Sequence, residues 1–198
     1  QRGSGRDSRR RGPALAQYGQ KFLFGGPREG AGEVGEYVRT GLKWQQWLAN
    51  MKYARKFTKT RRDLRMDLTM TMPGMVGLDE MLDAAEELDV DLLAKRVFGF
   101  DPTNLWSPMC LPRNILNRVV DKFIERNKSR LKNHIYFLAA LKDLKEKPTY
   151  EETYGNEKYR EGLKAGKKTV ERLDRVRSTD ISKILAKDEE ILSWWTSI

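Results

Sequence analysis

The supply of large apolar side chains sets the tightest limit on what this chain can fold into. Leu, Ile, Val and Phe together make up 45 of the 198 residues, while 33% of the residues are charged. Charged chains with a smaller share of these residues usually stay disordered, so only a thin hydrophobic core can form. No stretch approaches eighteen uncharged apolar residues, and the sequence therefore predicts no transmembrane span.

The apolar residues recur at helical spacing along most of the chain. We expect helices from about 36 to 69, 78 to 97, 112 to 147 and 156 to 177, and a last one capped by Ser178 or Thr179. No run alternates for long enough to need a sheet. The sequence predicts an all-α, extended helical protein of about five helices, with a long irregular basic N-terminal extension.

Glycine content divides the chain into segments. Residues 1–35 hold nine of the sixteen glycines and no lasting apolar pattern, so we expect a Gly/Arg-rich extension that orders against a partner. A helical body is expected at 36–147, followed by C-terminal helices and a Trp-rich tail at 148–198. The tail ends in Trp194 and Trp195, which we expect to dock either on the body or on a protein partner.

The first twelve residues hold five Arg and one acid. Arg- and Ser-rich, acid-poor N-termini are typical of organelle transit peptides, so we expect a mitochondrial protein on the matrix side. The alternative is a basic disordered tail on a nuclear or cytosolic protein. The Gly-rich run 25–32 looks superficially like a phosphate-binding loop. It lacks the Gly-Lys-Ser/Thr ending, and we expect no strand–helix unit around it.

Basic residues are concentrated in three further segments. Residues 52–65 hold seven bases and one acid, 113–132 hold seven and two, and 157–177 hold eight and four. Such segments neutralise phosphate backbones without a fixed motif, and Tyr53 or Trp44 could stack on bases. A solvated helix face is the alternative reading of each segment. The residues expected to bind RNA are Arg9, Arg10, Arg11, Lys52, Arg55, Lys56, Lys59, Arg61, Arg62, Arg65, Arg118, Lys122 and Arg126.

The run 79–91 is the opposite case, with seven acids and no base. Carboxylates at this spacing could bind a divalent metal or act as acid and base. They also suit a solvated helix face beside an apolar stripe, which is the interpretation we adopt. A third option is that the run meets a basic helix or a basic partner.

The chain contains few of the residue types that common catalytic and metal sites require. The chain has one Cys and one His, so a disulfide, a His/Cys zinc site, a Ser-His-Asp triad and a Cys-His dyad are all excluded within one chain. Cys110 is expected to pack in the interior, and His134 to be a core or interface residue. We therefore expect no enzyme, no cofactor, no metal and no small-molecule substrate.

These features together predict a non-catalytic RNA-binding structural protein of a large ribonucleoprotein. A mitochondrial ribosome is the expected host, with rRNA and neighbouring protein subunits as partners. The alternative is an accessory, non-catalytic subunit of a respiratory or ATP-synthase complex of the mitochondrial inner membrane. The two differ in what the basic faces meet, which is phosphodiester in the first and acidic protein or lipid headgroups in the second.

Overall fold

The computed structural model describes residues 27–97, 99 and 101–198, and it is mostly helical, with 64% helix and 7% strand. The predicted helical character is confirmed, but the number of helices is larger than about five. The helices are α1 (Gly32–Val38), α2 (Trp44–Arg55), α3 (Leu78–Glu87), α4 (Arg113–Arg126), α5 (Lys128–Leu131), α6 (Ile135–Glu146), α7 (Tyr150–Tyr154), α8 (Asn156–Arg177), α9 (Ile181–Leu185) and α10 (Glu189–Ser197). Short 3-10 helices lie at Pro73–Gly77 and Pro108–Cys110.

A parallel sheet lies among these helices, so the expectation of an all-α fold without strands is wrong. Its strands are β1 (Pro27–Arg28), β2 (Arg65–Met70) and β3 (Asp91–Arg96), in the spatial order β1-β2-β3. Buried residues alternate with half-buried ones along β2, as a strand with one buried face requires. The side chains of Met66, Leu68 and Met70 fill the buried positions.

The first predicted helix ends early, at Arg55. The Thr58 hydroxyl donates to the Arg55 carbonyl at 2.9 Å, and the chain then turns toward β2. In the sequence Tyr53, Phe57, Leu64 and Leu68 follow one another at spacings of four, seven and four, which would place them on one buried helix face. The two leucines instead belong to the segment that enters the sheet, and both aromatic side chains are exposed.

The second predicted helix stops at Glu87 because the backbone reverses there. Asp89 has a φ of 49°, in the left-handed region, and the Val90 amide donates to the Ala85 carbonyl at 3.0 Å. This arrangement ends helices. Leu92, which falls within the range 78–97 predicted as helix, therefore lies in β3.

The segment 112–147 forms three helices instead of one. Asn127 interrupts it, since its side-chain amide donates to the Phe123 carbonyl at 3.2 Å, and His134 stands at the N-cap of α6. The prediction for 156–177 is confirmed by α8. The last segment forms α9 and α10, capped by the carboxylates of Asp180 and Asp188.

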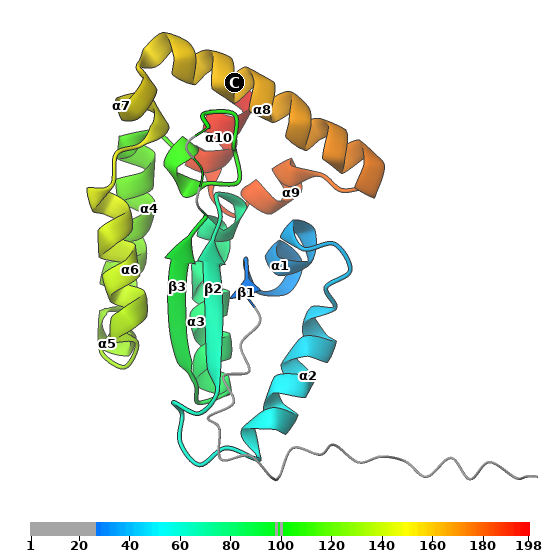
Figure 1. Cartoon of the computed structure of the whole chain (residues 1–198), viewed down its shortest axis with the longest axis vertical. Helices are drawn as coiled ribbons and strands as arrows, with labels where there is room; N and C mark the ends of the chain where they lie inside the picture. The colour runs from blue at the N-terminus through cyan, green and yellow to red at the C-terminus, as the bar shows by residue number, and fades with distance from the viewer. Residues whose placement is uncertain (1–26, 98, 100) are drawn as a thin grey trace, which may run out of the picture.

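One buried apolar cluster joins the described elements, so they are not an extended string of helices. In Figure 1, α6 runs beside β3, α1 and α2 lie on the β1 side, and α8 crosses the carboxyl end of the sheet. Trp194 and Trp195 are both buried in this cluster. The tail therefore docks on the body, and its indole rings are not an exposed surface.

Candidate nucleic-acid interface

The acidic run 79–91 is the point where two of the three basic segments, 52–65 and 113–132, converge. Each of its seven carboxylates pairs with a base from another part of the chain. The pairs are Asp79–Arg126, Glu80–Lys187, Asp83–Arg130, Glu86–Arg130, Glu87–Lys52, Asp89–Arg55 and Asp91–Arg61. The run is thus an internal counterion for α2, the loop after it, α4, α5 and residue 187. Its partners are bases of the chain itself, which is closest to the third option above, in which the run meets a basic helix.

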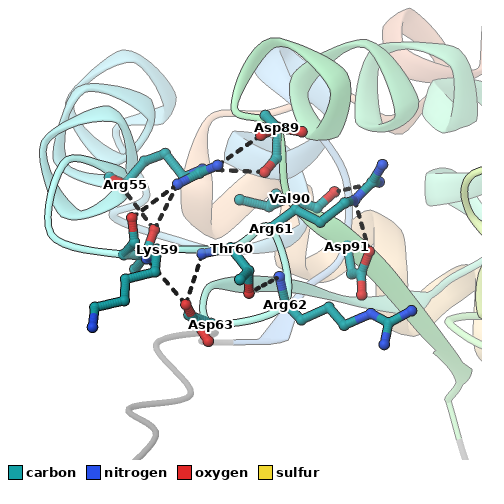
Figure 2. A network of polar contacts seen from close by, with 10 residues as sticks. Arg55, Lys59, Thr60, Arg61, Arg62, Asp63, Asp89, Val90 and Asp91 are labelled. Atoms are coloured by element: carbon teal, nitrogen blue, oxygen red, sulfur yellow. Dashed lines mark hydrogen bonds and ion pairs between the residues drawn. The ribbon is translucent and has the colours of Figure 1, made fainter.

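Three bases of the segment 52–65 are used to hold the loop after α2. Lys52 lies 2.5 Å from Glu87, Arg55 lies 2.6 Å from Asp89, and Arg61 lies 2.9 Å from Asp91. Figure 2 shows Arg55 and Arg61 turned back toward the start of β3. The Arg61 guanidinium also donates to the Val90 carbonyl at 3.2 Å. These three bases fix the position of the loop and do not form a free phosphate-contacting face.

The other bases of the same loop point outward. Lys56, Lys59 and Arg62 are exposed, and no carboxylate of the described residues pairs with them. In Figure 2 the Lys59 ammonium and the Arg62 guanidinium extend away from the network without a dashed line. The Asp63 carboxylate accepts from the Lys59 and Thr60 amides at 3.0 and 2.8 Å, which stiffens the turn that presents them.

Two exposed aromatic rings lie in the same stretch of chain. Tyr53 is 62% exposed and Phe57 73%, and their rings meet edge to face with centroids 5.0 Å apart. Trp44, the other expected stacking platform, is buried and stacks on Trp47. We call Tyr53, Lys56, Phe57, Lys59 and Arg62 the loop surface, since it combines unpaired cations with open ring faces.

The remaining predicted RNA-binding residues lie elsewhere. Arg118 is bound by Asp188 at 2.7 Å and by Glu190, which ties α4 to α10. Arg65 is half-buried in β2, whereas Lys122 is exposed on α4. Arg9, Arg10 and Arg11 lie outside the described residues.

Helix α8 also presents bases to solvent. Arg160, Lys164, Lys168 and Arg172 follow one another at four-residue spacing and are exposed. Three glutamates, at positions 157, 161 and 171, are exposed on the same helix. This mixture of signs matches a solvated helix face, so the loop surface is the stronger candidate.

The carboxyl edge of the sheet is a second candidate site, because ligands of open parallel sheets bind outside the carboxyl ends of the strands. Glu29, Thr71 and Val97, the residues that follow the three strands, line one hollow of about 430 Å³ together with Arg39 and Arg177 among others. Arg39 binds Glu29 through two hydrogen bonds, of 2.8 and 3.0 Å. The Thr71 hydroxyl donates to the Glu29 carbonyl and accepts from the Gly74 amide. Most polar groups at this edge are therefore occupied by the fold.

The described part of the Gly-rich run, residues 27–32, does lie in a strand–helix unit, which corrects the sequence expectation. Gly30-Ala31-Gly32-Glu33-Val34-Gly35 has the spacing G-x-G-x-x-G between β1 and α1, a signal the sequence contained. A Cβ at Gly35 would lie 2.3 Å from the Gly30 carbonyl oxygen, so packing alone requires this glycine. Helix α1 has seven residues, and Thr71 stands after β2 where dinucleotide sites carry an acid. The motif is explained by close packing.

Reactive groups in the interior are held in their neutral forms. Burial raises the pKa of the Cys110 thiol far above its usual range, and its Sγ lies 3.7 Å from the Leu105 carbonyl. Burial likewise lowers the pKa of His134, helped by the Arg61 guanidinium and opposed by Glu86 and Asp91. Within the described ranges, no three His, Cys, Asp or Glu side chains form a group that could hold a metal ion.

In comparisons with known proteins, no protein-family model, no curated protein and no solved structure matches the chain. In the part of the chain that the structure describes, no helix is long and apolar enough to cross a bilayer.

Proposed function

We propose that this chain is a non-catalytic RNA-binding structural protein of a large ribonucleoprotein, and that the loop surface contacts the RNA. One observation carries the proposal: bases next to a fully paired acidic run remain unpaired and exposed beside two open aromatic rings. Unpaired cations gain from releasing the counterions of a phosphate backbone, while paired ones must first break their own contacts.

The geometry of the loop surface supports single-stranded RNA as its ligand. Tyr53 and Phe57 offer ring faces on which unstacked bases can lie, and stacking tolerates any sequence. Lys56, Lys59 and Arg62 lie within a few residues of these rings and can meet the phosphates on either side. Because Arg55 and Arg61 anchor both ends of the loop, little ordering is required on binding.

The proposed host is a mitochondrial ribosome in the matrix, a proposal supported by the basic composition and by the several clusters of basic residues along the chain. Sedimentation of a native extract with and without RNase tests this assignment. Release of the chain from a heavy particle by RNase supports it. Persistence in a detergent-solubilised membrane complex would replace it with the accessory-subunit alternative.

A charge-reversal experiment tests the loop surface itself. The triple variant Lys56→Glu, Lys59→Glu, Arg62→Glu should bind single-stranded RNA about a hundredfold more weakly. The slope of log affinity against log salt concentration should become shallower by about two. Lys164→Glu, Lys168→Glu, Arg172→Glu is the matched control, because it changes the net charge equally on α8. Equal losses in both variants would show that only net charge matters and would remove the loop surface from the proposal.

A further inference from the structure

A second cleft adjoins the loop surface, between the loop after α2, the start of β3 and the start of α6. Its volume is about 250 Å³. The cleft shares Arg62 with the loop surface, so it is open to the same ligand. Its lining is rich in hydrogen-bond donors and holds a single carboxylate, Asp91, which Arg61 already engages.

The cleft lies at the N-terminus of α6, a helix of twelve residues. The first amides of a helix have no intrahelical acceptor, and the helix dipole favours a negative charge beside them. Helix α6 has no side-chain cap, and its first turn contains no acid. By contrast, Thr149 and Glu152 form a capping box at α7, and Asp188 caps α10.

Basic side chains surround this helix end. Arg62 and Lys132 line the cleft, both are exposed, and neither pairs with a carboxylate anywhere in residues 27–97, 99 and 101–198. Asn133 contributes a neutral side chain beside them. Uncapped helix amides together with a guanidinium and an ammonium are the groups that bind phosphate in proteins.

His134 gives a second, independent indication that this cleft takes a ligand. Its side chain lines the cleft, and the residue is only 3% exposed. Neither ring nitrogen has a hydrogen-bond partner within the described residues. Buried polar atoms are nearly always satisfied, so an unpaired buried imidazole calls for an explanation. An oxyanion at the end of α6 would supply the acceptor that its N–H lacks.

We infer that this cleft binds a phosphate group, held by the N-terminus of α6, Lys132, Arg62 and the His134 imidazole. The inference rests on the proposed function for the source of that phosphate, which is the backbone of an RNA strand that also crosses the loop surface. Tyr136, 60% exposed at the rim, gives the adjoining nucleotide a ring to stack on. Free phosphate is the other source with the same chemistry.

The chain provides its own probe, because His134 is the only histidine. Its imidazole signals in an NMR spectrum of the full chain need no assignment. We expect them to move when a single-stranded RNA oligonucleotide is added, and also when inorganic phosphate is added. Lys132→Glu should lower the phosphate affinity measured from this shift at least about tenfold, which is the usual contribution of one charge-assisted contact.

Lys128→Glu is the matched control for Lys132→Glu. Lys128 is exposed on the adjacent helix α5, pairs with no carboxylate in the described residues and does not line the cleft. We expect the phosphate affinity of the Lys128→Glu variant to stay within about twofold of that of the unchanged chain, since distant exposed charges are screened. Equal weakening by the two variants would overturn the assignment of the cleft.

The two ligand arms separate this inference from the proposed function. Unchanged His134 signals in both arms overturn the inference, even if fluorescence anisotropy shows that RNA binds elsewhere on the chain. A shift with inorganic phosphate and none with bound RNA keeps the phosphate site and overturns RNA as its source. If RNA does not bind at all, the proposed function fails, while the inorganic phosphate arm still decides the cleft.

Discussion

The segment 113–132 and the loop after α2 are both rich in basic residues but present different surfaces. Each lies in a stretch with seven basic residues. In α4 and α5 all four arginines are bound by carboxylates of other elements, and only lysines of the segment 113–132 are left without such a pair, whereas the loop leaves an arginine, Arg62, unpaired along with Lys56 and Lys59 among the described residues. The arginines of α4 and α5 are Arg113, Arg118, Arg126 and Arg130. A local excess of bases is therefore available to a partner only where the acids of the fold do not reach it.

The largest effect we expect in this comparison is on stability, at Arg118. Its guanidinium donates to Asp188 at 2.7 and 3.1 Å and also contacts Glu190, and the pKa of Asp188 is lowered despite its burial. Arg118→Ala leaves a partly buried carboxylate unpaired, so we expect a loss of about 2 kcal/mol in the free energy of unfolding. Urea unfolding measures it.

Arg62→Ala is the counterpart in the loop, and it should change the free energy of unfolding by less than about 0.5 kcal/mol. The RNA affinities should show the reverse order, with Arg118→Ala unchanged and Arg62→Ala weakened. If Arg118→Ala weakened RNA binding while the fold stayed intact, the division between structural and available arginines would be wrong.

The next largest effect concerns the aromatic pair. Tyr53→Ser with Phe57→Ser should lower the affinity for single-stranded RNA about thirtyfold, because each of the two stacked bases contributes at least roughly 1 kcal/mol. Affinity for duplex RNA should stay unchanged, since its bases are not free to stack. Val176→Ser on α8 is the control, being an exposed apolar residue (79% exposed) away from the loop surface. An equal loss for duplex RNA would leave only the charges of the loop as binding groups.

A smaller effect is expected on pH dependence. Burial lowers the pKa of His134 from 6.5 in the folded chain, so the unfolded state binds the proton more readily. Stability due to this group is complete above about pH 6.5 and is lost as the pH falls below it. Unfolding experiments between about pH 7.5 and 5.5 should show this decline, and His134→Gln should remove it. A decline that persists in the variant would have to come from other groups.

The smallest effect is expected at Arg126. Its guanidinium pairs with Asp79, but both side chains are well exposed, at 52% and 38%. Exposed pairs contribute little, so Arg126→Gln should lower the free energy of unfolding by less than about 0.5 kcal/mol. RNA affinity should stay within about twofold. A large loss of RNA affinity would return Arg126 to the binding surface and blur the contrast between the two segments.

Part of the fold could be read from the sequence. Apolar spacing located α8, whereas the polar–apolar alternation of Arg65–Met72, which marks β2, was overlooked when a helix was predicted there. β3 could not be found this way, because Leu88 and Leu92 are separated by four residues, as on a helix. The left-handed Asp89 between them decides the outcome, and no local pattern predicts it.

The candidate site was found only in outline. The segment 52–65 stays a predicted RNA-binding region, but Lys52, Arg55 and Arg61 within it are paired with carboxylates of the chain. Their partners lie 30 or more positions further along the chain, so only the folded arrangement of β2, α3 and β3 brings them together. The cleft at α6 was missed for the same reason, since its lining combines residues near 62, 91 and 134.

The parallel pairing of the sheet has a consequence for the order in which the chain can fold. β2, α3 and β3 form one continuous stretch from Arg65 to Arg96, so their contacts close short loops. β1 pairs with a partner about forty positions away and contributes only two residues. Loop closure of that length must precede any gain from so short a strand. During synthesis on a ribosome, β1 emerges first but should join the sheet last, once β2 has been made and placed.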